Sequence, residues 1–494
     1  MRHFVTITLA LLSTCAALAA QPAVPPGEFP WSGTIRRADL MKTVEYLASP
    51  RLGGRLAGSP GYMAAAREMA DRFKRLGLAP CGDDGFFQRL EVEYNEIETC
   101  RLGLVGPNGA MRALALGPDF VGRGLTGSGS FTAPLVFVGY GLSRPEKNYD
   151  DYAGMDVGGK VVLAFKDTPP FQSDSTKWDE GALPRPKGLV AAAHGALGML
   201  IVSPPNQAEP QKPIGSMLEG EGRQDERFPR LMVDIPVAEE MLRPARLELR
   251  ELQSEIDSTR TPRSRELGVS VRMDVKARYH PKQPSVNVVG MIEGSDPRLA
   301  GQCLVVGAHL DHVGSQAGQI FFPGANDNAS GAAAVLAIAG AFARAGARPK
   351  RSVIFALFSS EEAGLYGAKR FVSNPPVPRD SIVAYFNLDC VGHGDSIEVG
   401  GGKSLPRLWQ IARDVDRDGS RLMVEETRGG GGADASAFWR EKIPTLYFES
   451  KFSYTHLHLT SDLPATLNPA LLEAVARLAY GTAWRVAQGE FHRE

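Results

Sequence analysis

The sequence has no excess of either charge. Its 494 residues carry 55 lysines and arginines against 56 aspartates and glutamates, a net charge of -1. Nucleic acids and anionic membrane surfaces attract strongly basic proteins, so neither partner is expected. Hydrophobic residues make up 43% of the chain and charged residues 22%, as in soluble globular proteins. We therefore expect function to depend on particular side chains.

Cysteine is scarce, with five residues in the chain. No two of them stand close enough in sequence to form the paired ligands of a structural zinc site. Cys15 belongs to a predicted leader, described next. Cys81 and Cys100 lie in one loop-rich region and could pair in an oxidising compartment. Cys303 and Cys390 are predicted to be free, buried thiols.

Long apolar runs are missing after the first residues, so no membrane span is predicted. The N-terminus combines a basic start, an apolar segment and the triplet Ala17-Leu18-Ala19, which is typical of a secretory signal peptide over residues 1–20. We expect a secreted or periplasmic protein. A lipid anchor at Cys15 is not expected, because a threonine precedes this cysteine and apolar residues continue past it.

The length favours two or three domains. Residues 31–120 form the expected N-terminal part of the main domain, and within them 34–78 predict two helices around a glycine-rich turn. Residues 121–275 contain short β-rich runs separated by glycines. In residues 276–490, buried-strand runs alternate with helical segments. This alternation is typical of an α/β domain with a mostly parallel central sheet flanked by helices. We expect its strands at 285–294, 303–310, 352–360, 381–389, 421–427 and 443–450.

In such sheets ligands bind beyond the carboxyl ends of the strands, and here those ends are rich in histidine and acid. The candidates are His309, Asp311, His312, Asp327, Glu361, Glu362, Asp389, His393, His456, His458 and Asp462. Any one of them has an ordinary explanation; Asp327, for example, can cap the helix that follows it. Their repetition at almost every strand end is what indicates a site.

Imidazoles and carboxylates without cysteine suit zinc or a similar divalent ion in a catalytic site. Two histidines and three or four acids exceed the needs of one catalytic zinc, and they suit two metals that share a carboxylate. A polar network in which these groups satisfy one another is the alternative. Neighbouring side chains at a strand end point in different directions, so Glu361 and Glu362 are expected to have separate roles.

The segments NVVGMIEGSDP, GAHLDHVG, GANDNASGAAAVL, FSSEEAGLYGAKRF, NLDCVG, ADASAFW, IPTLYFES and HLTSD resemble, in this order, the secreted di-zinc aminopeptidases of peptidase family M28. The segment GGRLAGSPG resembles the family's N-terminal part. LVFVGYGLSRPEKNYDDYAGMDVGGKVVLAF resembles the protease-associated (PA) domain that many members carry. The resemblance implies a zinc-exopeptidase α/β fold, with a PA-like insertion at 121–275 and a catalytic di-zinc domain at 276–490.

The resemblance also implies roles at the matched positions. The implied metal ligands are His309 and Asp389 for one Zn²⁺, Glu362 and His458 for the second, and Asp327 between the two. Glu361 would be the general base, and Asp311 would orient His309 as a carboxylate behind the ligand. Asp434 matches an acid that lies near the base in related enzymes.

Several neighbouring residues carry weaker expectations. His458 is preferred to His456 as the ligand, because the family pattern places an acid four residues later and Asp462 stands there. The aromatic residue that often precedes this ligand is replaced by Leu457. His456 is expected at the rim or in a hydrogen bond, and Tyr454 is a candidate hydroxyl for a tetrahedral intermediate.

Other expectations concern the turns. His312 and His393 are predicted to be surface or hydrogen-bonded histidines. Asn328 and Ser330 are expected to shape the turn that aims Asp327, and Gly331 to allow close packing of the helix. The glycine run 429–432 is expected to form a mobile or tightly turning loop near the cleft.

The resemblance implies an aminopeptidase that acts on peptides with a free N-terminus; the residues do not specify an oligomeric state. A carboxypeptidase of the same family would need arginines near the strand ends for the substrate carboxylate, and no such cluster is obvious. A glutaminyl cyclase would not need five ligands. A non-catalytic binding protein on this scaffold would usually have lost ligands or the base.

Overall fold

The computed structural model describes residues 32–493 except 172–177, 179–182 and 452–453. The predicted signal peptide (1–20) and Cys15 lie outside the described residues. Within the described ranges, no helix is both long and apolar enough to cross a bilayer.

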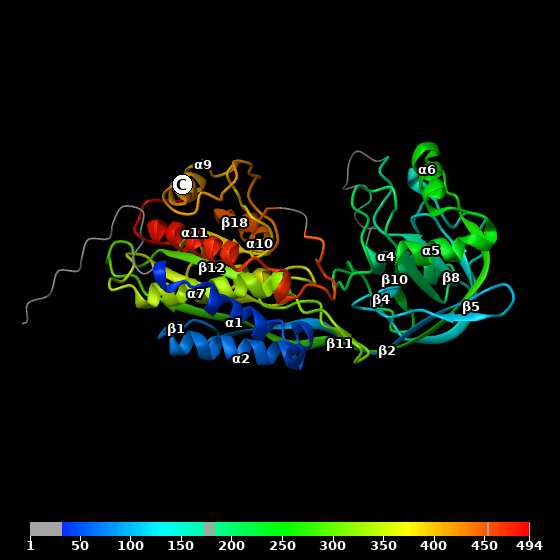
Figure 1. The fold of residues 1–494 in the computed structure, drawn as a ribbon, viewed down its shortest axis with the longest axis horizontal. Helices are drawn as coiled ribbons and strands as arrows, with labels where there is room; N and C mark the ends of the chain where they lie inside the picture. The colour runs from blue at the N-terminus through cyan, green and yellow to red at the C-terminus, as the bar shows by residue number, and fades with distance from the viewer. Residues whose placement is uncertain (1–31, 172–177, 179–182, 452–453, 494) are drawn as a thin grey trace, which may run out of the picture.

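The described chain forms two lobes that share one continuous β-sheet (Figure 1). The apolar cores of the first lobe come from residues 35–78 and 286–487, and those of the second lobe from residues 97–275. Strands β2 (Phe87–Val105) and β11 (Arg265–Ile292) pair with each other in antiparallel fashion and run from one lobe into the other. The connection between the lobes is therefore a paired ribbon.

The first-lobe part of the sheet has the strand order β17-β18-β16-β12-β15-β11. Its parallel strands are β12 (Cys303–His309), β15 (Ser352–Phe358), β16 (Ile382–Leu388) and β18 (Thr445–Ser450). Strands β17 (Ile397–Gly400) and β11 flank them in antiparallel orientation. The predicted mostly parallel central sheet is confirmed. The short strands of this lobe are β1 (Ala79–Pro80), β13 (Ser315–Gln316) and β14 (Ile320–Phe321).

Both faces of this sheet are covered. All residues of β12 are buried; Leu304 and Val306 join one core, and Cys303 and Val305 join the opposite one. The helices of the first core are α1 (Arg37–Leu47), α2 (Pro60–Arg75), α7 (Gly331–Arg344), α9 (Pro406–Asp418) and α11 (Pro469–Ala487). Those of the opposite core are α8 (Tyr366–Ser373) and α10 (Ala435–Arg440).

The second lobe continues the sheet in the order β11-β5-β8-β9-β10-β4. Its strands are β3 (Met111–Ala113), β4 (Phe120–Gly122), β5 (Gly129–Phe137), β6 (Ser143–Arg144), β7 (Tyr149–Asp150), β8 (Val161–Phe165), β9 (Gly198–Val202) and β10 (Arg230–Val233). Helix α4 (Pro184–Ala193) covers one face, while α5 (Ile235–Leu242) and α6 (Leu249–Thr259) cover the other.

Two expectations about the elements need correction. The core of the second lobe already contains Ile97, so this lobe begins well before residue 121. Because β2 is one uninterrupted strand, no break in the pattern marks the junction. The strand predicted at 421–427 is reduced to a single bridge between Met423 and Ile397, and the edge of the sheet is formed by β17 instead.

The cysteines in the described part of the chain are all free. Cys81 packs against the first-lobe core that contains Cys303, whereas Cys100 belongs to a core of the second lobe. The suggested pairing of Cys81 with Cys100 is therefore wrong. Cys303 is buried as predicted, and Cys390 is partly exposed.

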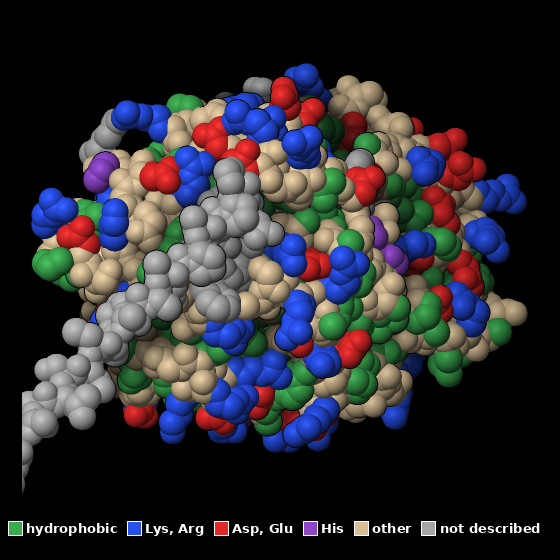
Figure 2. Space-filling view, turned by 60° about the vertical axis from the view of Figure 1, so that its left-hand side comes forward, with side chains coloured by type: hydrophobic (Ala, Val, Ile, Leu, Met, Phe, Trp, Pro, Cys, Tyr) green, Lys and Arg blue, Asp and Glu red, His purple; other side chains and the backbone are tan. Residues whose placement is uncertain are grey.

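On the face drawn in Figure 2, acidic and basic side chains are intermingled. This distribution agrees with the nearly balanced charge of the whole chain.

Candidate metal centre

Histidine and acidic side chains converge at the carboxyl ends of the parallel strands. His309 is the last residue of β12, Asp389 directly follows β16, and Glu361 follows β15 after two serines. Asp327 comes from the turn before α7, and His458 from the segment between β18 and α11. Parallel strands end at one edge of the sheet, which brings residues distant in sequence together there.

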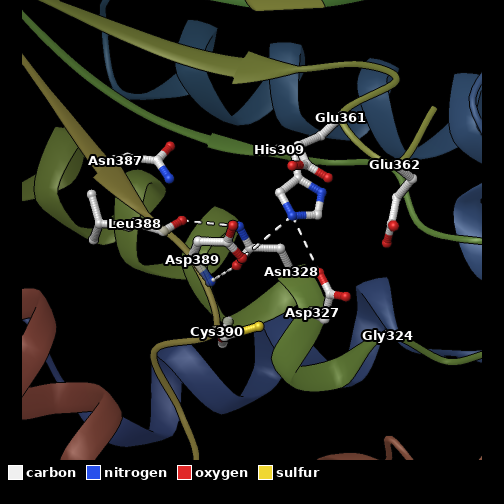
Figure 3. A network of polar contacts seen from close by, with 12 residues as sticks. His309, Gly324, Asp327, Asn328, Glu361, Glu362, Asn387, Leu388, Asp389 and Cys390 are labelled. Carbon is white, nitrogen blue, oxygen red and sulfur yellow. Dashed lines mark hydrogen bonds and ion pairs between the residues drawn. The ribbon is translucent and has the colours of Figure 1, made fainter. Parts of the chain in front are cut away.

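The first group of potential metal ligands consists of His309, Asp327 and Asp389, all buried. The Nε2 atom of His309 lies 3.2 Å from Oδ1 of Asp327 and 3.4 Å from Oδ1 of Asp389 (Figure 3). The other ring nitrogen, Nδ1, donates to the carbonyl oxygen of Asp311 at 3.2 Å. That hydrogen bond leaves Nε2 directed at the two carboxylates.

The second group consists of His312, Asp327, Glu362 and His458. Nε2 of His458 lies 3.0 Å from Oδ2 of Asp327 and 3.0 Å from Oε2 of Glu362. His312 is fully buried, and its Nδ1 lies 2.8 Å from Oε1 of Glu362. In each group the ligand atoms all lie within 4.8 Å of one another.

Asp327 is the member common to both groups. One of its carboxylate oxygens faces His309 and the other faces His458. A carboxylate in this position can bind one cation through each oxygen.

The protonation of the two imidazoles reflects the surplus of acid. Burial lowers the pKa of His309, but Asp389 and Asp327 outweigh it and leave the pKa raised well above its usual value. Burial likewise lowers the pKa of His458, and Glu362 and Asp327 raise it well above the usual value. The cluster thus attracts positive charge at both ends of Asp327. Divalent cations would replace these protons, because a metal-bound imidazole is neutral.

The backbone around Asp327 is fixed by side chains on either side. The carboxylate of Asp462 accepts from the backbone N–H groups of Asn326 (2.8 Å) and Asp327 (3.1 Å). Asn328 donates to the carbonyl of Leu388 at 2.9 Å, next to Asp389. Its oxygen accepts from the N–H of Gly331 at 2.9 Å. The turn that presents Asp327 is thereby tied to the strand end that presents Asp389.

The expected supporting roles of Ser330 and Gly331 also hold. The Ser330 hydroxyl donates to the carbonyl of Asn326 at 2.6 Å and accepts from the N–H of Val391 at 3.1 Å. A Cβ at Gly331 would lie 2.3 Å from the carbonyl oxygen of Leu388, so only glycine allows α7 to start this close to β16.

Glu361 and Glu362 leave neighbouring positions in different directions, with Glu361 turned toward His309 (Figure 3). Burial raises the pKa of Glu361 well above its usual value, His309 opposes this, and the charge of Glu362 adds to it. By contrast, burial raises the pKa of Glu362, but His458 and His312 outweigh it and bring the value to about 2. One acid is thus poised to hold a proton and the other to remain a carboxylate.

Asp311 and Asp434 flank Glu361. Asp311 accepts from the Glu361 backbone N–H at 3.2 Å, and burial raises the pKa of Asp311 to about 6. Its carboxylate lies 3.8 Å from Nδ1 of His309, farther than its carbonyl, so the main chain of Asp311 makes the closer contact with this ring. Asp434 is fully buried, and neither carboxylate oxygen has a hydrogen-bond partner among the described residues.

The remaining histidines lie in different surroundings. His312 is not a surface residue, since it is buried and bonded to Glu362. His393 donates to the carbonyl of Thr466 at 2.9 Å. His456 is partly exposed and hydrogen-bonded to Ser461 at 2.9 Å, so of the two histidines in this segment it is His458 that reaches Asp327 and Glu362.

Tyr454 does not have the position expected of it. Its hydroxyl is bonded to Asp462 and lies 3.1 Å from the hydroxyl of Thr466. The side chain therefore supports the acid behind Asp327, and its hydroxyl is already engaged.

Two supporting residues were not singled out from the sequence. Tyr447 of β18 donates from its hydroxyl to Oδ2 of Asp389 at 3.1 Å. Arg428 stacks on the Tyr447 ring, 4.5 Å from its centroid, and pairs with Glu449 at 2.5 Å. Gly432, at the end of the predicted glycine turn, has a positive φ and lies against the same ring. The turn thus packs beside a residue that orients a ligand.

The second is Arg55, whose side chain is completely buried. Its guanidinium donates to the carbonyl oxygens of Leu310 (2.9 Å), Pro323 (2.8 Å) and Gly324 (2.9 Å). These carbonyls flank His309 and Asp327 in sequence. Burial lowers the pKa of Arg55 to about 10, against the acids of the site, which raise it.

A sequence model of peptidase family M28 matches residues 287–483. Leupeptin-inactivating enzyme 1 of Streptomyces exfoliatus is 40% identical over 174 residues, which cover 34% of this chain and 36% of that protein. An aminopeptidase of Pseudomonas aeruginosa is 26% identical over 374 residues, which cover 73% of this chain and 58% of that protein. The chain therefore spans less than two thirds of the length of either curated relative.

Solved structures match over nearly the whole chain. A zinc aminopeptidase from Bacillus subtilis has a TM-score of 0.62 at 18% identity, and the match covers 93% of this chain and 96% of the chain of that protein. A peptidase M28 precursor from Shewanella amazonensis has a TM-score of 0.67 at 17% identity, and the match covers 94% of this chain and 96% of the chain of that protein. The TM-scores and the coverage show a common fold that includes both lobes.

Proposed function

We propose that the chain is a metallo-aminopeptidase of peptidase family M28, the family whose sequence model matches residues 287–483, and that it removes N-terminal residues from peptides. The position of Asp327, between two groups of potential ligands, carries the proposal. The relative from Pseudomonas aeruginosa, which bears the name aminopeptidase, supports it.

We assign two zinc ions to the site. Their ligands are His309 and Asp389 for the first ion, Glu362 and His458 for the second, and Asp327 for both. Nitrogen and oxygen donors without thiolate suit a catalytic zinc site, and the donor atoms lie within 4.8 Å of one another in each group. Zinc bound there would lower the pKa of a water molecule and polarise the substrate carbonyl.

Glu361 is assigned as the general base. It takes the proton from the attacking water and later delivers it to the nitrogen of the leaving amine. The raised pKa of Glu361 suits a group that must hold a proton between two steps. Asp311 holds the Glu361 backbone in place through the N–H group. Asp434 adds a buried carboxyl group without a partner among the described residues, and burial raises its pKa well above the usual value. A protonated α-amino group of the substrate nearby would favour the charged form of this carboxyl group.

A carboxypeptidase is the second candidate, because a probable glutamate carboxypeptidase of Arabidopsis thaliana is 28% identical over 335 residues. That reaction needs a free cation for the substrate carboxylate. Arg428 lies next to the Tyr447 ring, but Glu449 neutralises it at 2.5 Å and Glu398 lies within 3.8 Å. The pairing of Arg428 favours the aminopeptidase. The full set of five ligands likewise favours a hydrolase over a cyclase or a non-catalytic scaffold.

The test uses three substrates: an aminoacyl amide, its N-acetylated form, and an N-blocked dipeptide with a free carboxyl end. We expect hydrolysis of the first alone, its loss on treatment with a chelator, and its return with added zinc. Hydrolysis of the blocked dipeptide alone would establish the carboxypeptidase. Activity that survives complete removal of metal would refute both.

We also propose that residues 1–20 are a cleaved signal peptide, that the mature protein is secreted or periplasmic, and that the second lobe is a PA-like domain. The N-terminal pattern and the β-rich second lobe support these assignments. Mass spectrometry of the exported protein is expected to give a chain that begins near Gln21. An exported chain that retains Met1 would contradict the cleavage.

A further inference from the structure

The second lobe touches the candidate metal centre directly. The backbone N–H of Gly215, in the segment between β9 and β10, donates to the carbonyl oxygen of His458 at 3.0 Å. His458 has a φ of 57°, in the left-handed region that side chains other than glycine seldom adopt. A residue in this conformation persists when its surroundings hold it there. The hydrogen bond from Gly215 of the second lobe is one of the contacts that keep His458 in this conformation.

The segment that contains Gly215 is bonded to the rest of the second lobe. The carbonyl of Ser216 accepts from the N–H of Gly124 at 3.0 Å. Glu219 is buried between Arg123, at 2.9 Å, and Arg230, at 3.5 Å. Movement of the lobe would therefore move Gly215 with it.

Three further contacts join the same lobe to the segments that carry the second ligand group. Ile214, Val121 and Met232 pack with Val313 and Phe322, which lie between His312 and Asp327 in sequence. The side chain of Gln316 makes two hydrogen bonds of 2.8 Å to the backbone of Gly122. Met217 and Leu125 pack with Leu56 and with Ala363, the residue after Glu362.

The first ligand group is held by other means. His309 and Asp389 adjoin β12 and β16, which pair with each other in the first lobe. Asp311 and Tyr447, both from the first lobe, orient them. The second lobe thus supports the Glu362 and His458 half of the centre, and the first lobe supports the His309 and Asp389 half.

We propose that the second lobe is a positioning element for one half of the metal centre: the docked Gly215 segment sets the affinity of the zinc site at Glu362 and His458. The site at His309 and Asp389 does not depend on it. The inference rests on the two-metal function proposed above and extends it to a structural role for the second lobe.

The test is zinc titration of the Gly215→Ala variant against a chromophoric chelator. A Cβ at position 215 would lie 2.7 Å from Cγ2 of Val313 and 3.0 Å from the Phe322 ring, so the segment must shift away. We expect the affinity for one zinc to fall about tenfold or more, as when a partner of a ligand is lost, while the other ion stays bound. Activity should recover at high zinc.

Gly103→Ala is the matched control, because a Cβ there would meet its nearest neighbours in the second lobe at an ordinary 3.4 Å. Gln316→Ala provides an independent variant that removes two hydrogen bonds between the lobes, and we expect it to weaken the same site by a smaller factor. The inference would be overturned if Gly215→Ala and Gln316→Ala both kept the wild-type affinity for both zinc ions. Equal weakening of both zinc sites in these two variants would also overturn it. A wild-type protein that binds only one zinc would instead refute the two-metal function, and the inference with it.

Discussion

The two halves of the candidate metal centre are constructed differently. His309 ends one strand and Asp389 follows its parallel neighbour, and the His309 side chain is only 2% exposed. His458 lies outside any strand or helix, its side chain is 18% exposed, and its carbonyl is bonded to the other lobe. Ligands at strand ends inherit the rigidity of the sheet, whereas a ligand on an irregular segment depends on tertiary contacts. The zinc affinity of the first half should therefore change little with mutations outside the sheet, whereas the zinc affinity of the second half should fall with them.

The largest effect on activity is expected from the proposed general base, Glu361, which belongs to neither ligand group. Glu361→Gln removes the proton acceptor but keeps the size of the side chain, and we expect aminopeptidase activity to fall by about 10³-fold. Zinc content should remain that of the wild type. The measurement is kcat together with metal analysis of the same preparation.

The adjacent Glu362→Gln is the control, and it should lose one zinc from the half that contains His458. Unchanged activity in Glu361→Gln would remove Glu361 from the mechanism.

The next prediction separates the halves by removing one ligand from each. Asp389→Ala and His458→Ala are each expected to weaken one zinc site by about 100-fold or more, since even the loss of a partner behind a ligand costs 10–100-fold. In the metal-free protein both variants should also lower the unfolding temperature: Asp389→Ala leaves the buried Tyr447 hydroxyl without its acceptor, and His458→Ala removes the imidazole that lies 3.0 Å from Asp327 and from Glu362. Zinc titration separates the two variants; weakening of the same zinc site by both would contradict the assignment of these ligands to different halves.

A smaller effect is expected from Tyr447→Phe, which removes the hydrogen bond to Asp389 and keeps the ring that Arg428 covers. The zinc site at His309 and Asp389 should weaken about tenfold, and the other site should keep its affinity. Tyr385→Phe is the control, because that buried hydroxyl donates to Asn387. If Tyr447→Phe weakened the His458 site as well, the two halves would not be independently supported.

The smallest effect concerns the second lobe alone. Burial lowers the pKa of Lys187 from its usual 10.5 to about 7. Between these values the unfolded chain binds more protons than the folded one, so stability should rise with pH above 7, by at most about 1.4 kcal/mol per pH unit. We expect the unfolding temperature of the zinc-loaded protein to rise between pH 7 and 8.5, and Lys187→Met to flatten this rise.

Lys212→Met, at an exposed lysine of the same lobe, should leave the slope unchanged. An equal slope in Lys187→Met and in the wild type would exclude Lys187 as its source.

The sheet of the first lobe and the meeting of the ligands could be predicted from the sequence, because both depend on local pattern. Buried runs such as 303–310 identify strands, and parallel strands place the residues after them at a common edge. That rule places His309, Glu362 and Asp389 among the candidates, and the family resemblance selects them, together with His458, as ligands. Which nitrogen faces which oxygen required the coordinates.

The supporting residues could not be predicted, because their partners are distant in sequence. Arg55 donates to carbonyls more than 250 residues away, and a lone arginine in a glycine-rich turn gives no sign of burial. Tyr447 lies in a run of buried residues in β18, where an aromatic residue gives no sign of a special role. Tyr454 was a candidate hydroxyl for a tetrahedral intermediate, but its hydroxyl is bonded to Asp462. The start of the second lobe was missed because β2 continues through it.

The ribbon of β2 and β11 constrains how the chain is assembled during synthesis. The last part of β11 (Val288 to Ile292) pairs with β15 and so completes the first-lobe sheet. It leaves the ribosome only after the whole second lobe, and β12 follows later still. Helices α1 and α2 are therefore made early but must wait for the strands that they cover. The inserted lobe can fold first, which reverses the usual order in which the N-terminal domain is completed before the next.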